Sequence, residues 1–102
     1  MAQFQAYRNP RASKEKIPFL LDVQSDLANI GTRLIVPLVL ESAFGARLTR
    51  INPVLQVDGI RVVASVADLA GVPAQQLKDK VADCSKHRGE ILAAIDFMLS
   101  GF

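Results

Sequence analysis

The dipeptide Asp58-Gly59 lies between two segments of alternating residue character, and it constrains the fold more than any other feature of this sequence. Both residues accept the positive φ angles that the two central positions of a type I′ hairpin turn require. With Val57 paired to Ile60, one face of the hairpin is entirely apolar and comprises Ile51, Pro53, Leu55, Val57, Ile60, Val62, Ala64 and Val66. The opposite face is mostly polar and comprises Asn52, Val54, Gln56, Arg61, Val63 and Ser65. A slip of one residue would turn the apolar face to water, so the sequence predicts a fixed register in an antiparallel sheet with one packed face.

Three upstream segments, residues 4–7, 17–24 and 33–40, also have strand character. The third is apolar almost throughout, which indicates a strand covered on both faces. Pro37 interrupts it, and because proline cannot donate a ladder hydrogen bond, we expect a bulge or a sheet edge there. The remaining connections are predicted to be loops and turns, including a turn-rich crossing, whereas residues 74–80 fit neither pattern.

The periodicity becomes helical near Asp83. An apolar stripe recurs at spacings of three, four and seven and comprises Cys84, Ile91, Ile95, Met98 and Phe102, with Leu92 and Leu99 beside it. Asp83 or Ser85 suits the start of this helix, and Gly101 suits a left-handed residue at its end. Strands followed by one long terminal helix predict the α+β class, and 102 residues predict a single domain over residues 1–102.

Composition narrows the classes of function. The single cysteine forbids an intramolecular disulfide and suits a reducing cytoplasm, where we expect the protein to act. No apolar segment is long enough to cross a bilayer, and we expect neither a signal peptide nor a membrane partner. The formal charge of +2 is modest for a nucleic-acid binder, so no direct sequence-specific contact with nucleic acid is predicted.

The chain carries few of the side chains that catalysis uses. One histidine, His87, and one cysteine, Cys84, do not make an ordinary His/Cys zinc site, and neither a phosphate-binding glycine loop nor a nucleophile elbow is present. We interpret Cys84 as a buried structural thiol. No catalytic residue, metal or cofactor is expected, and the sequence indicates a binding module.

Several residues leave two interpretations open. Asp22 and Asp26 lie four residues apart and either pair as carboxylates, or Asp26 or Ser25 caps a turn. Arg33 and Arg88 either bind an anion or are solvated at the surface. Phe102, at the end of the helical stripe, either packs into its own core or is kept for a partner.

Five short motifs resemble, in their order and spacing, the CcdB family of toxins from plasmid and chromosomal toxin–antitoxin pairs. They are residues 22–26 (Asp-Val-Gln-Ser-Asp), residues 33–38 (Arg-Leu-Ile-Val-Pro-Leu), Val72-Pro73, residues 81–83 (Val-Ala-Asp) and residues 93–102 (Ala-Ala-Ile-Asp-Phe-Met-Leu-Ser-Gly-Phe). The resemblance covers essentially the whole chain. It implies a small SH3-like antiparallel β-barrel or sheet with one long C-terminal helix, assembled as a homodimer.

The resemblance also implies a function. Members of this family poison DNA gyrase by binding its A subunit and stabilising the cleaved gyrase–DNA complex, and a partly disordered CcdA-like antitoxin neutralises them. Carried onto this sequence, the gyrase-binding residues are Ser100, Gly101 and Phe102, followed by Asp96, Leu27, Ser25 and Tyr7.

One position departs from the family pattern. The best-known member has tryptophan where this chain has Ser100, and serine offers much less apolar area for anchoring, although Phe102 is larger than the usual isoleucine.

Two alternative functions stay open. One is an mRNA-cleaving toxin on the same fold, using Arg33 with Thr32 or Asp26, and the other is a chromosomal relic that folds and dimerises without toxicity.

Overall fold

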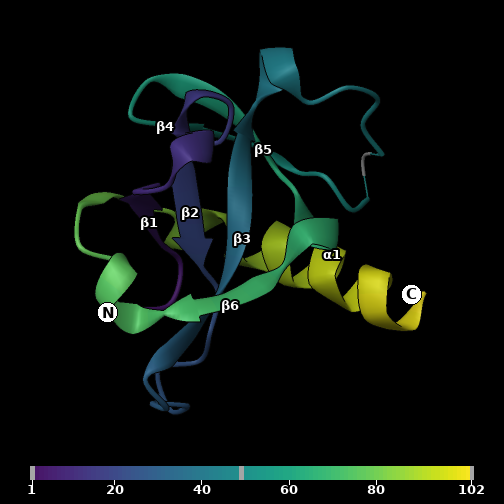
Figure 1. The fold of residues 1–102 in the computed structure, drawn as a ribbon. Helices are drawn as coiled ribbons and strands as arrows, with labels where there is room; N and C mark the ends of the chain where they lie inside the picture. The colour runs from purple at the N-terminus through teal and green to yellow at the C-terminus, as the bar shows by residue number, and fades with distance from the viewer. Residues whose placement is uncertain (1, 49, 102) are drawn as a thin grey trace.

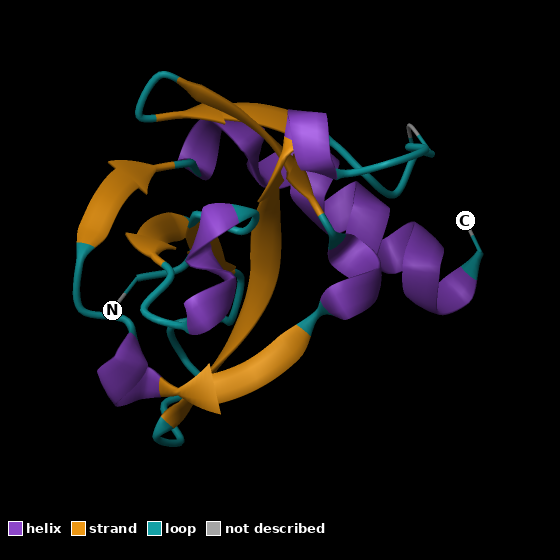
Figure 2. Cartoon of the chain, turned by 45° about the horizontal axis from the view of Figure 1, so that its top comes forward, coloured by secondary structure: helices purple, strands orange, loops and turns teal. Residues whose placement is uncertain are grey.

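The computed structural model describes residues 2–48 and 50–101. Within these residues the chain forms seven strands and one α-helix, joined by loops and short 3-10 turns. In chain order they are β1 (Gln5–Arg8), β2 (Phe19–Asp22), β3 (Thr32–Leu40), β4 (Val54–Val57), β5 (Ile60–Ala64), β6 (Ala70–Pro73), β7 (Lys80–Asp83) and α1 (Arg88–Ser100). All the strand pairs are antiparallel, in the order β4-β5-β3-β2-β1-β7, and β6 pairs with β3. The sheet curls into a half-barrel beside α1, which confirms the α+β, SH3-like prediction (Figures 1 and 2).

Strands β4 and β5 form the predicted hairpin. Val57 pairs with Ile60, and the φ angles of Asp58 and Gly59 are 52° and 79°, as a type I′ turn requires. The apolar face is buried along most of its length, but Ile60 beside the turn is exposed. The expectation of a mostly wet opposite face is wrong for three of its residues, which are buried: Asn52, Val63 and Ser65. Residues 43–46 line one hollow together with Ser65, a long-range proximity that a period-two pattern does not reveal.

The turn gives a matched test of backbone strain. Replacing Gly59 by alanine places a Cβ at φ +79°, which costs about 1 kcal/mol because left-handed backbone is unfavourable for L-residues. Gly71 in β6 has no positive φ, and a Cβ there meets nothing within 4 Å. We expect Gly59→Ala to lower the free energy of unfolding in urea by about that amount, and Gly71→Ala to leave it equal or slightly higher. Equal losses in both variants would contradict this account.

Strand β3 is the centre of the sheet, as its apolar composition predicted. It pairs with β2 on one side and with both β6 and β5 on the other. The bulge or edge expected at Pro37 is wrong, because the register with β2 runs without interruption through the Leu20–Pro37 pair. Pro37 instead lies between Ile35, the last partner of β6, and Leu38, the first partner of β5. The missing N–H is tolerated where β3 changes partners.

Two strands and the start of the helix differ from the sequence prediction. The segment expected to be a turn-rich crossing, residues 68–73, contains β6. Strand β7 lies between the unassigned residues 74–80 and the predicted start of the helix near Asp83. Both strands are four residues long, too short to show a clear alternation. The helix α1 begins at Arg88, and the predicted cap Asp83 instead accepts a hydrogen bond from the Ser85 amide before a 3-10 turn.

The core occupies both faces of the sheet. The larger cluster lies under α1 and includes Ile91 and Ala94 from the helix with Cys84 from the segment before it. The smaller cluster lies on the other face and comprises Tyr7, Leu20, Ile35, Val72 and Leu77. The predicted helical stripe is therefore displaced: Ala94 is buried, whereas Met98 is exposed. Phe102, the last residue of that stripe, lies outside the described residues.

Candidate functional site

The loop between β2 and β3, residues 23–31, carries two of the predicted contact residues. It lies at one end of the molecule, beyond the ends of the two strands (Figure 1). Ser25 is exposed, and Leu27 is almost completely exposed, at 96%. Ile30 in the same loop is 73% exposed. An apolar loop tip of this kind is a candidate for contact with another protein.

A buried ion pair underlies this loop. The Arg33 Nε donates to Asp22 Oδ2 at 2.8 Å, and Arg33 Nη2 donates to Asp22 Oδ1 at 3.1 Å. Both side chains are buried, so the bidentate geometry is what compensates for their desolvation. These hydrogen bonds raise the pKa of Arg33 above its ordinary value. Asp22 and Arg33 come together because Asp22 lies opposite Ile35, and Arg33 is its diagonal neighbour on the same face.

The same arginine reaches into the loop. Its Nη2 also donates to the Gln24 carbonyl at 3.2 Å and to Asp26 Oδ1 at 3.3 Å. Asp26 Oδ1 accepts a second hydrogen bond from the Gln3 amide at 2.9 Å. Of the two interpretations left open here, turn capping is confirmed for Ser25, whose hydroxyl accepts from the Leu27 amide at 3.2 Å. Asp22 Oδ1 likewise accepts from the Gln24 amide at 3.1 Å, and the structure shows no bare carboxylate pair. Both carboxylates are partners of Arg33.

Tyr7 lies in the smaller core cluster, next to this network. It is buried and pairs with Leu20 across β1 and β2. Burial raises the pKa of its phenol, and the charges of Asp22, Arg33 and Asp26 are close enough to contribute. Tyr7 is therefore placed to support the β2–β3 loop from inside the fold, with little surface of its own to offer a partner.

The other predicted contact residues lie at the end of α1. Asp96 and Ser100 are exposed, and the Ser100 hydroxyl donates to the Asp96 carbonyl at 2.7 Å. Gly101 has φ 81° and its amide donates to the Phe97 carbonyl at 2.8 Å, so it ends the helix in the left-handed conformation that was predicted. Phe102 lies outside the described residues, and its role stays a prediction.

A contact from the long β3–β4 connection steadies this end of α1. The Arg50 guanidinium lies 4.0 Å from the centre of the Phe97 ring. Stacking of this kind is favourable and joins the connection to the last turns of the helix. The helix is thus held at its start by Ile91 and Ala94 in the core and further along by Arg50.

The predicted set divides into two areas within one chain. Tyr7, Ser25 and Leu27 belong to the β2–β3 loop and its support, whereas Asp96, Ser100 and Gly101 belong to the end of α1. Both views of the chain show these areas at different ends of the molecule (Figures 1 and 2). One copy of the chain therefore presents two separate surfaces.

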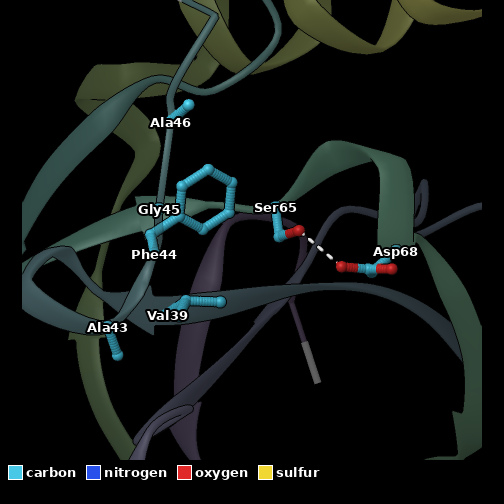
Figure 3. Close-up of a pocket in the computed structure, with 7 residues that line it drawn as sticks. All are labelled: Val39, Ala43, Phe44, Gly45, Ala46, Ser65 and Asp68. Carbon is cyan, nitrogen blue, oxygen red and sulfur yellow. Dashed lines mark hydrogen bonds between the residues drawn. The ribbon is translucent and has the colours of Figure 1, made fainter.

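A separate hollow of about 390 Å³ lies on another part of the surface (Figure 3). It is lined by Val39, Ala43, Phe44, Gly45, Ala46, Ser65 and Asp68. The Ser65 hydroxyl donates to Asp68 at 2.6 Å, and Asp68 is the one titratable side chain among these lining residues. A single carboxylate with a hydroxyl does not make an acid–base pair, and the hollow contains none of the predicted site residues.

The residues considered for other chemistry are engaged elsewhere. Burial raises the pKa of the Cys84 thiol, as expected for a structural cysteine. His87 Nδ1 lies 2.7 Å from Glu90 Oε1 at the start of α1. Arg33 is neither a surface arginine nor free to bind an external anion, since Asp22 and Asp26 neutralise it inside the fold. This placement disfavours the nuclease alternative, which needs Arg33 at a scissile phosphate.

No helix among residues 2–48 and 50–101 is long and apolar enough to cross a membrane. Over the same residues, histidine, cysteine, aspartate and glutamate side chains form no group of three that would hold a metal ion.

Sequence reasoning missed the Arg33 network, although it named all three of its charged members. The register of β2 on β3, which sets Asp22 opposite Ile35, is what places Asp22 and Arg33 on one face. Without the register, neither the partner of Arg33 nor its burial was visible.

The curled antiparallel sheet and the C-terminal helix α1 define a small SH3-like α+β fold. A comparison with protein-family models agrees with the resemblance noted in the sequence: the model described as CcdB protein matches residues 3–101, nearly the whole chain. The chain belongs to the CcdB family, the toxins of toxin–antitoxin systems.

Proposed function

We propose that this protein is a toxin that binds the A subunit of DNA gyrase and traps the cleaved gyrase–DNA complex. Membership of the CcdB family is the observation that carries the proposal. An exposed leucine on a braced loop and a well-anchored helix end are the features that a contact poison needs. The bond-breaking chemistry belongs to gyrase, so the toxin needs no nucleophile, metal or cofactor of its own.

The proposed form is a homodimer of single-domain chains acting in the cytoplasm. Within one chain, the β2–β3 loop and the end of α1 are separate, and a twofold axis doubles both surfaces. Two copies engage a symmetric target together, so the second contact benefits from a high effective concentration. A partly disordered CcdA-like antitoxin neutralises the toxin by folding onto its surface.

Ser100 favours a second candidate, a family member with weak or lost toxicity. Its side chain supplies little apolar area, and its hydroxyl is already bonded to the helix backbone at Asp96. A contact made through this position is therefore weaker than one made through tryptophan. The rest of the described contact areas, including Leu27, is unaffected by this change.

The test is a supercoiling assay with purified gyrase and the full-length chain. We expect supercoiling to be inhibited and linear DNA to accumulate when the reaction is stopped with detergent and protease, because the cleaved complex is trapped. Incubation with single-stranded RNA serves as the control for the nuclease alternative, and the RNA should stay intact. A chain that binds the gyrase A subunit without inhibiting it would be the non-toxic relative, and discrete RNA cleavage would replace the proposal.

A further inference from the structure

The β2–β3 loop combines an exposed apolar tip with a hydrogen-bonded backbone. Leu27 at its tip has almost no contact with the rest of its own chain, yet the backbone around it is held by several hydrogen bonds. The Ser25 hydroxyl accepts from the Leu27 amide at 3.2 Å, and the Ser25 carbonyl accepts from the Ala28 amide at 3.0 Å. Further along, the Gln24 side-chain oxygen accepts from the Leu34 amide at 2.7 Å.

Asp26, the residue next to Leu27, connects this loop to the interior. One of its carboxylate oxygens, Oδ1, accepts from Arg33 Nη2 at 3.3 Å and from the Gln3 amide at 2.9 Å. The arginine cannot follow a moving loop, because Asp22 holds it in a bidentate pair inside the fold. Asp26 is thereby hydrogen-bonded to a side chain that is held in place inside the fold.

The two aspartates differ in what they contribute. Asp22 is fully buried, and its pair with Arg33 supports the folding of the sheet, while its Oδ1 also accepts from the Gln24 amide at the start of the loop at 3.1 Å. The side chain of Asp26 is 58% exposed, and an exposed ion pair contributes little to global stability. The effect of Asp26 is local: it restricts the conformations of the residues beside it.

We infer that Asp26, held by Arg33, is a positioning residue that keeps the β2–β3 loop in the conformation in which Leu27 meets the target. The inference rests on the proposed function, since the target is the gyrase A subunit. A loop ordered before binding loses less conformational entropy on binding, and the contact made by Leu27 is then stronger. Asp26 itself makes no contact with the target and acts through Leu27.

A double-mutant cycle distinguishes positioning from direct contact. Affinity for a purified fragment of the gyrase A subunit is measured for wild type, Asp26→Ala, Leu27→Ala and the double variant. We expect each single change to weaken binding by about tenfold, and the double variant to bind about as weakly as Leu27→Ala alone. Asp26→Asn keeps an acceptor oxygen and should recover part of the loss. Asp79→Ala, an exposed aspartate paired with Arg8 at 3.1 Å, is the control and should bind as wild type does.

Amide relaxation of residues 24–28 in the free protein provides a measurement that needs no target. Fast backbone motion should increase in Asp26→Ala, with an unchanged melting temperature, and stay as in wild type for Asp79→Ala. Additive losses of affinity in the cycle would show direct contact and overturn the inference, as would an unchanged loop in Asp26→Ala. If wild type fails to bind the gyrase fragment, the proposed function fails, and the relaxation result alone still decides whether Asp26 orders the loop.

Discussion

Removal of residues 100–102 is expected to abolish gyrase inhibition while the protein stays folded. The described residues lost, Ser100 and Gly101, are exposed and lie beyond the last buried helical residue, Ala94. Truncation at such a site changes the free energy of unfolding by about 0.5 kcal/mol or less. The inhibitory concentration in the supercoiling assay should rise by at least about 100-fold, the loss of a central anchor in a protein interface.

A substitution that enlarges the side chain at position 100 is the matched variant for this truncation. Ser100→Trp restores the aromatic residue of the family pattern and should lower the inhibitory concentration, because tryptophan buries much more apolar area on the target. Thermal unfolding of both variants, followed by circular dichroism, shows whether the fold is kept. A folded truncation that inhibits as well as wild type would exclude the helix end as the poisoning element.

Local signals were sufficient for part of the fold. Asp58-Gly59 specified the turn, the pairing of Val57 with Ile60 and the face to be buried, because all of that information lies within sixteen consecutive residues. The central position of β3 was also visible in its composition. Strands β6 and β7 were not, since four residues carry too little periodicity and their pairing with β3 and β1 is decided by distant segments.

The candidate site divides in the same way. The resemblance supplied Leu27 and the end of α1, because it rests on short local motifs. The support of the loop was invisible, since it depends on Arg33 crossing from β3 to a carboxylate on β2. The sequence left Arg33 as a candidate for phosphate contact, whereas in the structure it is buried and paired with Asp22.

Asp22→Asn is expected to cause the largest loss of stability among the changes considered. The substitution keeps the volume of the side chain and removes the charge that pairs with buried Arg33. Breaking a buried pair by removing one partner costs about 3–5 kcal/mol, because the remaining charge stays desolvated. Urea unfolding measures it, with Asp79→Asn as control, whose pair with Arg8 is exposed and contributes no more than about 1 kcal/mol. Equal losses in the two variants would show that the buried pair contributes no more to the free energy of unfolding than the exposed pair does.

Replacing both members of the pair separates folding from function. In Asp22→Leu with Arg33→Met, two apolar side chains occupy the volume, so no charge is desolvated and most of the lost stability should return. The support of the loop does not return, because methionine cannot donate to the Gln24 carbonyl or to the Asp26 carboxylate, and leucine cannot accept from the Gln24 amide. The double variant should therefore melt near wild type while it binds the gyrase A subunit as weakly as Asp26→Ala. Recovery of both stability and binding would mean that the polar network serves the fold alone and that the sheet positions Leu27 without it.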